Sequence, residues 1–418
     1  MDVTLHHPTF FHHIEAPSSK SAAHRHMIAA AFADAPTKIT LCGAGEDIAA
    51  TAACLRAIGV GVEELSDGFV ITPCTGFSQN AIADCGESGS TLRFLVPIVS
   101  ALGLSVRFLR RGRLPQRPME PLKSELAEHG VTMQDGEDGS LFVSGTLTAG
   151  AYRIAANVSS QFITGLLFAL SLLDEPSTLT LAGEIESAPY IDMTLQTLAA
   201  FGCKVDILPK NTFGIPGRRQ APFHTPGAIV TEGDYSGAAF PLSAGAIGDH
   251  PVCVGGLTAG SAQGDRAILA LLERFGADVK IDTEHNTVTV SPAPLCGIDI
   301  DAKQIPDLVP VLAVVAACAK GDTRITGAGR LRIKESDRIA TTAALLRNLG
   351  GAVEELEDGL LIHGARPLTG GTVSGAGDHR IVMSAAVAAL VCKGPVTVLG
   401  AEAVKKSYPL FFETAISG

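Results

Sequence analysis

The sequence is poor in several features that would direct a protein to particular compartments or partners. Among its 418 residues there is no apolar run of 18 residues, so no membrane-spanning helix is predicted. The first ten residues have neither a basic start nor an apolar stretch, so we expect no secretory signal peptide. The 32 lysines and arginines are outnumbered by 43 aspartates and glutamates, giving a net charge of −11. This acidity disfavours nucleic-acid binding, which depends on many cation–phosphate contacts.

Paired cysteines and metal-ligand clusters are also missing. The nine cysteines are scattered, and none forms a C-x-x-C pair. This is typical of reduced thiols in a cytoplasmic protein. The pairs His6–His7 and His12–His13 have no cysteine or carboxylate at ligand spacing, so we expect no metal site. The G-x-x-x-x-G-K frame of a nucleotide-binding P-loop does not occur at Lys20 either.

One pattern occurs six times, about every seventy residues. Each copy has a polar cluster, then an Ala/Leu/Val-rich helical stretch, then a β-branched strand. Because a helix N-terminus has unpaired N–H groups and the positive end of the helix dipole, it attracts anions. If the helix starts converge, they form an anion-binding chamber. The polar clusters begin near Ser21, Ser90, Gln161, Ser236, Asp307 and Arg380.

A second element repeats in the same register. Five helical stretches end in a glycine followed by a strand, with intervals of 71, 72, 74 and 74 residues between the glycines. Glycine just past a helix end permits the left-handed cap conformation. Each unit should therefore contain two helices and several strands in the order βαβαββ. The glycines are Gly59, Gly130, Gly202, Gly276 and Gly350.

The repeats predict an α/β protein with two domains of three units each. The opening helices are apolar nearly all round, so we expect them in the domain cores, with sheets and second helices outside. Each domain would then be an inside-out α/β barrel-like structure. The sixth unit lacks a second helix, and the N-terminal strand could complete it. We therefore expect an N-terminal domain over residues 19–231 and a C-terminal domain formed by residues 1–18 and 232–418.

The densest group of charges is GRLRIKESDRIA, residues 329–340. On a helix Lys334 and Arg338 would share one face because they are four positions apart, and Glu335 follows Lys334 in the sequence. Such a run taken alone is more often a solvated helix start. We nevertheless interpret this run as part of a site, because cations also stand near the polar clusters of the other repeats. These are Lys20, Arg25, Arg93, Arg117, Arg380 and Lys406.

So many cations in an acidic chain exceed the need of one monoanion. They predict two multiply charged small substrates, at least one a phosphate, which arginine binds bidentately. Asp307 and Glu335 are the candidate acid–base residues. Hydroxyl and amide donors stand at other helix starts, where the alternative is ordinary capping, worth about 1 kcal/mol. These donors are Ser21, Ser159, Ser160, Gln161 and Ser187.

Ten segments, in order along nearly the whole chain, resemble the EPSP synthase family (3-phosphoshikimate 1-carboxyvinyltransferases). The resemblance implies the enolpyruvyl transferase fold, with the active site in the cleft between two domains. It implies transfer of the enolpyruvyl group of phosphoenolpyruvate to the 5-hydroxyl of shikimate 3-phosphate, with release of phosphate. No metal or organic cofactor is implied, and we expect a cytoplasmic monomer. The segments are PSSKSAAHR, ESGSTLRF, LPQRPMEPL, VSSQFITGLL, ESAPYIDMTL, TEGDYSGAAF, IPDLVPVLAV, LRIKESDRI, GDHRIVMSAAV and KKSYPLFFE.

The resemblance also implies residue roles by position. Asp307 is similar to the acceptor of the hydroxyl proton, Glu335 to the residue that exchanges a proton with the phosphoenolpyruvate methylene, and Lys20 to a catalytic residue shared by both substrates. Residues similar to shikimate 3-phosphate ligands are Lys20, Ser21, Arg25, Ser159, Ser160, Gln161, Ser187, Asp307 and Lys334. Residues similar to phosphoenolpyruvate ligands are Lys20, Gly89, Arg117, Gln161, Arg338, Arg380 and Lys406.

Three positions depart from the usual family pattern. Glu87 and Ser90 stand where many members have Asn and Thr, and Arg330 stands where a substrate-binding Asn is common. A carboxylate at position 87 would repel phosphoenolpyruvate unless it paired with a cation such as Arg93. We therefore omit Glu87 from the ligands, and the sequence leaves the role of Arg330 open.

Two other functions compete with this interpretation. The sister transferase that acts on UDP-N-acetylglucosamine relies on a reactive cysteine in a mobile loop, but the corresponding residues 110–120, RRGRLPQRPME, contain no cysteine. A non-catalytic anion-binding repeat protein would need neither Asp307 nor Glu335. We also expect inhibition by glyphosate, because Gly89 leaves room where a methyl group would crowd that inhibitor.

Overall fold

The computed structural model describes residues 1–74 and 76–417, which form two compact units. We call Lys20–Thr231 the middle unit. The terminal unit combines Met1–Ser19 with the described residues from Glu232 onward. The N-terminal segment therefore folds with the C-terminal half of the chain.

The middle unit contains three four-stranded sheets with one topology. In each sheet the first two strands are parallel, and the other two continue antiparallel. The third sheet takes its first strand from the end of the unit's sequence, so the repeat closes on itself. The sheets are β7 (Ala81–Asp84), β8 (Val106–Leu109), β10 (Leu141–Gly145), β9 (Val131–Asp135); β11 (Ala151–Ala155), β12 (Ser177–Ala182), β14 (Thr212–Ile215), β13 (Asp206–Leu208); and β15 (Ala228–Val230), β4 (Thr37–Thr40), β6 (Gly68–Thr72), β5 (Gly61–Leu65).

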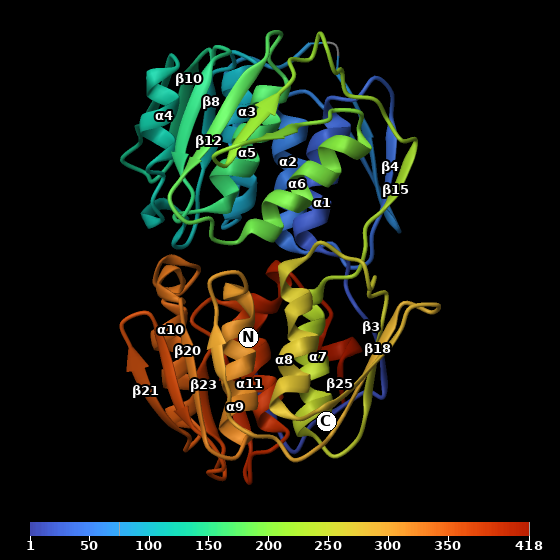
Figure 1. Cartoon of the computed structure of the whole chain (residues 1–418), viewed down its shortest axis with the longest axis vertical. Coiled ribbons are helices and arrows are strands. Elements are labelled where there is room, and N and C mark those ends of the chain that lie inside the picture. Colours follow the sequence, from blue (N-terminus) through green and yellow to red (C-terminus); the bar gives the residue numbers. More distant parts are fainter. Residues whose placement is uncertain (75, 418) are drawn as a thin grey trace. The chain divides into compact units, whose positions relative to one another are not determined.

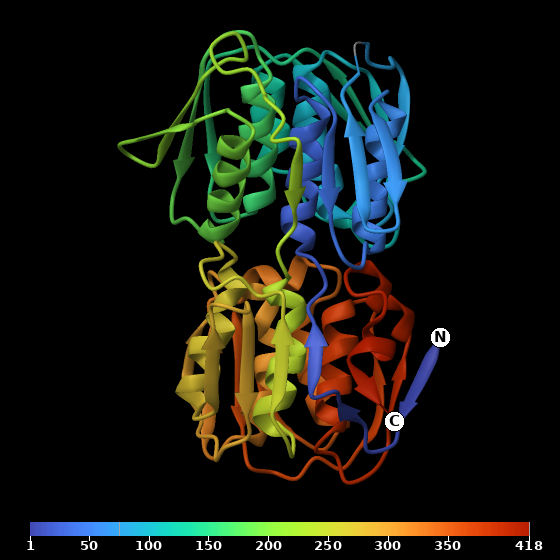
Figure 2. The same ribbon diagram turned by 90° about the vertical axis from the view of Figure 1, so that its right-hand side faces the viewer.

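The terminal unit repeats this topology in two four-stranded sheets, and its N-terminal segment adds one strand to each of three sheets. β3 (His13–Glu15) pairs parallel with β16, and β1 (Asp2–Leu5) pairs antiparallel with β24, as Figure 2 shows. β1 thus completes the last repeat. β2 (Thr9–Phe10) pairs with β25 (Ile416–Ser417). The three larger sheets are β3, β16 (Val252–Gly255), β18 (Thr287–Ser291), β17 (Asp278–Asp282); β19 (Asp299–Asp301), β20 (Asp322–Thr326), β22 (Gly359–His363), β21 (Ala352–Leu356); and β23 (Gly371–Ser374), β24 (Val396–Leu399), β1.

In the part of the chain that the structure describes, six largely buried helices form the cores. In α7, every residue except the last is buried, and α9 is buried to the same degree. Figure 1 shows such helices enclosed by sheets within each unit. The predicted inside-out α/β architecture is confirmed. The core helices are α1 (Lys20–Ala31), α3 (Gly89–Ala101), α5 (Ser160–Ser171), α7 (Tyr235–Ile247), α9 (Val309–Cys318) and α11 (His379–Ala389).

Five second helices lie outside the cores and end as predicted. All five predicted glycines follow a helix closely and have positive φ, between 85° and 114°. This left-handed conformation is strained for a residue with a Cβ, which explains why glycine recurs there. The helices are α2 (Glu46–Ala57), α4 (Leu122–Glu128), α6 (Ala188–Ala200), α8 (Ile268–Phe275) and α10 (Arg338–Asn348).

Short helices join several of these elements, and two of them hold candidate site residues. The 3₁₀ turn η3 (Pro306–Leu308) precedes α9, and η4 (Gly329–Ile333) leads into α10. The others are η1 (Leu114–Gln116), η2 (Gly264–Ala267), η5 (Ala401–Lys406) and the short helix α12 (Phe411–Thr414).

Three wider features concern the part of the chain that the structure describes. No helix there is long and apolar enough to cross a membrane. No group of three or more His, Cys, Asp or Glu side chains there is arranged to hold a metal ion. All nine cysteines are free thiols.

Candidate functional site

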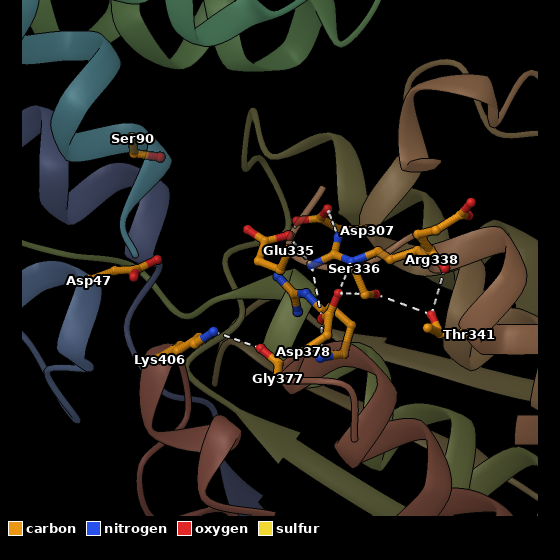
Figure 3. A network of polar contacts seen from close by, with 12 residues as sticks. Asp47, Ser90, Asp307, Glu335, Ser336, Arg338, Thr341, Gly377, Asp378 and Lys406 are labelled. Carbon is orange, nitrogen blue, oxygen red and sulfur yellow. Dashed lines mark hydrogen bonds and ion pairs between the residues drawn. The ribbon is translucent and has the colours of Figure 1, made fainter. Parts of the chain in front are cut away.

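An ion-pair cluster surrounds Arg338 in the terminal unit. Arg338 is the first residue of α10 and is 1% exposed. Its guanidinium donates to three carboxylates, with Nη1 2.7 Å from Asp307 Oδ1, Nη2 2.9 Å from Glu335 Oε2 and Nε 2.8 Å from Asp378 Oδ2 (Figure 3). We call Asp307, Glu335, Arg338, Asp378 and Arg380 the Arg338 cluster. The fold thus brings together residues that lie far apart in the sequence.

Arg380 supplies the second guanidinium of this cluster. It lies in the first turn of the core helix α11 and is 2% exposed. Its Nη2 donates to Asp307 Oδ2 at 3.3 Å, and its Nη1 donates to the Ser236 carbonyl oxygen at 2.8 Å. Each carboxylate oxygen of Asp307 therefore faces an arginine. Asp307 does not cap α9, because it lies within η3 and Leu308 occupies the cap position.

The cluster is strongly ionised. Burial alone would raise the pKa of Asp307, but Arg338, Arg380 and Lys334 together lower it far below its usual value. Burial likewise opposes the charge on Arg338, yet its carboxylate neighbours raise the arginine pKa well above normal. Asp307 is therefore a carboxylate at neutral pH, and it is a weak base while both guanidinium groups hold it.

Other predicted cations lie close to the same cluster. The prediction that Lys334 and Arg338 share one helix face is wrong, because α10 begins at Arg338 and Lys334 stands before it in an extended conformation. Lys334 acts electrostatically on Asp307. Lys406, the last residue of η5, donates from Nζ to the Gly377 carbonyl oxygen at 2.6 Å (Figure 3). Arg330 donates to the Lys303 carbonyl oxygen at 2.9 Å. Lys334 and Lys406 thus add positive charge next to the cluster.

In the middle unit, α1 begins with a lysine that has an ion-pair partner. Lys20 Nζ lies 2.8 Å from Asp47 Oδ2, a residue in the first turn of α2. Both side chains are mostly buried, with 16% and 13% exposed. Ser21 follows in the helix, and its carbonyl oxygen accepts a hydrogen bond from Arg25. An anionic ligand at Lys20 would have to compete with Asp47.

Arg25 is a buried cation with neutral partners. It is 2% exposed and donates to the Thr194 and Thr164 hydroxyls at 2.9 and 3.1 Å. It also donates to the Ser21 and Tyr190 carbonyl oxygens at 2.6 and 2.9 Å. Within residues 1–74 and 76–417 it forms no ion pair, and burial lowers its pKa to about 10. A buried guanidinium without a counter-ion favours an anionic ligand.

A hydrogen-bonded chain links the starts of α3 and α5. Arg93 Nη1 donates to Gln161 Oε1 at 2.7 Å, and Gln161 Nε2 donates to the Ser90 hydroxyl at 2.9 Å. The helices can approach because position 165 is glycine, where a Cβ would lie 2.4 Å from the Arg93 carbonyl oxygen. The Glu87 carboxyl group lies against Gly112, where a Cβ would be 2.5 Å from its Cδ. The donor groups of Arg93 and Gln161 are therefore fixed in place.

Gly89 permits close contact with Arg117. Gly89 is the first residue of α3, and Arg117 is 8% exposed. A Cβ built on Gly89 would lie 2.6 Å from Arg117 Nη1. This arrangement places a guanidinium beside the positive end of a helix dipole, which favours binding of an anion at that point.

The predicted serines occupy the starts of α5 and α6. The Ser159 hydroxyl caps α5 by accepting from the Gln161 amide at 3.3 Å, and Ser160 follows it, buried. Ser187 precedes α6 in a left-handed conformation with φ 56°. This conformation costs a non-glycine residue about 1 kcal/mol or more and is common where backbone geometry serves a ligand.

Several functional partners were not predicted from the sequence. Asp378 is not among the residues predicted for the site, yet it is fully buried and bound to Arg338. Nothing in the sequence pattern indicates that Asp47 pairs with Lys20 or that Thr164 and Thr194 hold Arg25. These partners lie 27, 139 and 169 residues from the cations that they contact, so only the tertiary fold reveals them.

Comparison with known proteins gives one consistent result. Residues 11–415 match the family model of EPSP synthase (3-phosphoshikimate 1-carboxyvinyltransferase). Proteins named 3-phosphoshikimate 1-carboxyvinyltransferase from Clostridium perfringens and Clostridium kluyveri are each 40% identical over 403 residues. The aligned regions cover 96% of this chain and 94% and 93% of the two relatives.

Solved structures agree. An EPSP synthase from Acinetobacter baumannii is 28% identical, with a TM-score of 0.80 over 100% of this chain and 98% of that one. The enolpyruvyl transferase NikO from Streptomyces tendae is 20% identical and shares the fold, with a TM-score of 0.79 over 99% of this chain and 98% of that one. The family predicted from the ten sequence segments is confirmed: the chain belongs to the EPSP synthase (3-phosphoshikimate 1-carboxyvinyltransferase) family.

Proposed function

We propose that this chain transfers the enolpyruvyl group of phosphoenolpyruvate to the 5-hydroxyl of shikimate 3-phosphate and releases phosphate. Membership of the family supports the reaction. The observation that connects it to particular residues is the ionised Asp307, each of whose oxygens faces a buried arginine. Carboxylates and guanidinium groups in contact combine proton transfer with anion binding, and this reaction needs both.

Asp307 is proposed to accept the proton of the 5-hydroxyl as the hydroxyl oxygen bonds to C2 of phosphoenolpyruvate. While Arg338 and Arg380 hold Asp307, its pKa is too low for efficient proton transfer. A substrate anion that accepts hydrogen bonds from either arginine would weaken the ion pairs between Asp307 and the arginines, and the pKa of Asp307 would rise. Substrate binding would thereby activate the base.

Glu335 is proposed to exchange a proton with C3 of phosphoenolpyruvate. Glu335 is a carboxylate while it pairs with Arg338, so it must first take up a proton from solvent. It gives this proton to C3 during addition, which produces a tetrahedral intermediate with a methyl group. It takes a proton back from the methyl group as the C–O bond to phosphate breaks. The proton from the 5-hydroxyl then leaves with phosphate, so the overall balance closes. Lys20 is proposed to offset the charge that develops on the departing phosphate.

The remaining assignments are proposals that follow the family resemblance and fit the local geometry. Arg25 has no counter-ion in the described part of the middle unit, which suits a ligand phosphate or carboxylate. The proposed shikimate 3-phosphate ligands are Lys20, Ser21, Arg25, Ser159, Ser160, Gln161, Ser187, Asp307 and Lys334. The proposed phosphoenolpyruvate ligands are Lys20, Gly89, Arg117, Gln161, Arg338, Arg380 and Lys406.

The proposed ligand set includes residues of both units, so the reaction should need the whole chain. We propose that the protein acts as a monomer in the cytoplasm. Its nine free thiols suit a reducing compartment. Light scattering of the purified protein measures the oligomeric state directly, and a dimer mass would contradict the monomer.

A phosphate-release assay tests the function. Phosphoenolpyruvate is supplied with either shikimate 3-phosphate or UDP-N-acetylglucosamine, and released phosphate is measured. We expect turnover only with shikimate 3-phosphate. Turnover with UDP-N-acetylglucosamine instead would favour the sister transferase. No turnover with either acceptor, in a protein that still binds both anions, would favour a non-catalytic binding protein.

A further inference from the structure

A buried carboxyl group lies beside the Arg338 cluster. Asp265, in η2, is 2% exposed. Its Oδ2 contacts the hydroxyl of Ser236, at the start of α7. Its Oδ1 is buried and has no hydrogen-bond partner in the part of the chain that the structure describes. A carboxylate with a bare buried oxygen would be strongly destabilising, whereas a carboxylic acid leaves only a neutral carbonyl unpaired.

The charged groups around Asp265 also favour the neutral acid. Asp307 of η3, Arg380 of α11 and Asp234 at the N-terminus of α7 face it, together with the Ser236 hydroxyl. Burial contributes most, and Asp307 next, to a pKa of about 7 for Asp265, while Ser236 and Arg380 act in the opposite direction. The only cation of this set, Arg380, already bonds to Asp307.

Ser236 connects Asp265 with Arg380. The same serine that contacts Asp265 through its hydroxyl accepts from Arg380 Nη1 through its carbonyl oxygen at 2.8 Å. Arg380 Nε is buried and has no hydrogen-bond partner among residues 1–74 and 76–417. Arg380 therefore keeps an unused donor. A second carboxylate nearby would repel an anion that approached this donor.

We infer that Asp265 is a proton-bearing positioning residue for Arg380. As a neutral acid it holds Ser236, and through the Ser236 carbonyl it orients Arg380 without reducing the positive charge that Arg380 offers to an anionic substrate. The inference rests on the proposed function, in which Arg380 binds phosphoenolpyruvate. When Asp265 loses its proton, affinity for phosphoenolpyruvate falls.

The test compares wild type with Asp265→Asn, which keeps the shape and the donor of the acid but cannot ionise. The KM for phosphoenolpyruvate is measured at about pH 6 and about pH 8.5. Between these two pH values Asp265 of wild type loses its proton and adds a negative charge near Arg380, whereas the variant gains none. The KM of wild type should therefore rise roughly tenfold more than the KM of the variant. The ionisation of phosphoenolpyruvate is the same in both assays, so the ratio isolates the protein group. Asp278→Asn, the same change in the exposed strand β17, should follow wild type.

Two further measurements cover the case in which Asp265→Asn does not fold. Ser236→Ala removes the hydroxyl that stabilises the carboxylate but keeps the carbonyl, so the midpoint of the KM change should move to higher pH. Infrared difference spectra of wild type between the two pH values should show loss of a protonated carboxyl band, and Ser236→Ala should alter that band.

Parallel pH profiles of wild type and Asp265→Asn, or an infrared spectrum without a protonated carboxyl band at the lower pH, would overturn the inference. Equal loss of affinity in Asp265→Asn at both pH values would assign Asp265 a structural role only. If wild type shows no turnover at any pH, the proposed function fails, and the infrared measurement still decides the protonation of Asp265.

Discussion

Arg338 Nη1 lies 2.7 Å from Asp307 Oδ1, and this ion pair joins two residues 31 positions apart in the sequence. The contact has a different effect on each of the two residues. For Arg338 it is one of three carboxylate contacts that hold a buried guanidinium. For Asp307 it keeps the pKa low until an anion competes for the arginine. Removing each partner should therefore produce different defects.

Asp307→Ala should lower turnover at least about 10²-fold, because the proposed base is lost. Binding of shikimate 3-phosphate should stay within about tenfold of wild type, since most proposed ligands remain. Steady-state kinetics and calorimetric titration measure the two effects. Asp278→Ala, on the surface of the same unit, is the matched control. Unchanged turnover would contradict the catalytic assignment.

Arg338→Met should be a stability mutation as well as a binding mutation. Asp378 is fully buried, and loss of its guanidinium partner leaves an uncompensated charge, which costs roughly 3–5 kcal/mol. The control is Arg332→Met, whose half-exposed ion pairs with Asp337 and Glu355 should contribute no more than about 1 kcal/mol. Urea titration gives both free energies of unfolding. Equal values for the two variants would contradict this account of the cluster.

Arg25→Met should separate stability from binding. Arg25 carries a buried charge that has no counter-ion among the described residues. Its removal should therefore change the free energy of unfolding by no more than about 1 kcal/mol despite the loss of four hydrogen bonds. Affinity for shikimate 3-phosphate should fall at least about tenfold. Arg56→Met, on the exposed side of α2, should leave that affinity unchanged. A large loss of stability with normal binding would show that Arg25 is structural.

Gly89→Ala tests the contact at the start of α3. The added methyl group would lie 2.6 Å from Arg117 Nη1 and displace that guanidinium, while the helical backbone accommodates alanine. The KM for phosphoenolpyruvate should rise, and inhibition by glyphosate should weaken by about tenfold or more. Gly260→Ala is the control, because no atom of the described residues lies within 4 Å of a Cβ there. Equal inhibition of wild type and Gly89→Ala would refute the steric argument.

Much of the fold could be predicted because its signals are local and repeated. A glycine after each second helix indicates a left-handed cap, and all five predicted glycines have positive φ. The apolar character of α7 and α9 likewise reports burial without knowledge of the neighbours. The pairing of strands is less local. β3 joins β16 and β1 joins β24, and each pair joins segments more than 200 residues apart in the sequence, so only the tertiary fold determines them.

The site was predictable to a smaller extent. Cations at helix starts are visible in the sequence because an acidic chain otherwise has little reason to place them in apolar segments. The carboxyl groups that pair with these cations or lie beside them are not visible, since Asp47 and Asp265 resemble ordinary residues near a helix start. Burial and pairing decide what such carboxylates do, and both follow from packing between elements. The pKa of Asp265 is an example, because burial and Asp307 together set it.

The same carboxyl group makes stability depend on pH. Asp265 has a pKa of about 7 in the folded protein, whereas a carboxyl group in an unfolded chain titrates near pH 4. Between these values the folded protein binds a proton that the unfolded chain has released. The contribution of Asp265 to the free energy of unfolding therefore falls as the pH rises through this window. Asp265→Asn removes this dependence.

The free energy of unfolding of Asp265→Asn minus that of wild type should accordingly increase by roughly 2–3 kcal/mol between about pH 5 and pH 8. Urea titrations of both proteins at the two pH values give the difference, in which the other titrating groups cancel. Asp278→Asn should show no such growth, because its exposed carboxylate keeps contact with water. A difference between variant and wild type that is the same at both pH values would mean that Asp265 is already ionised at the lower one.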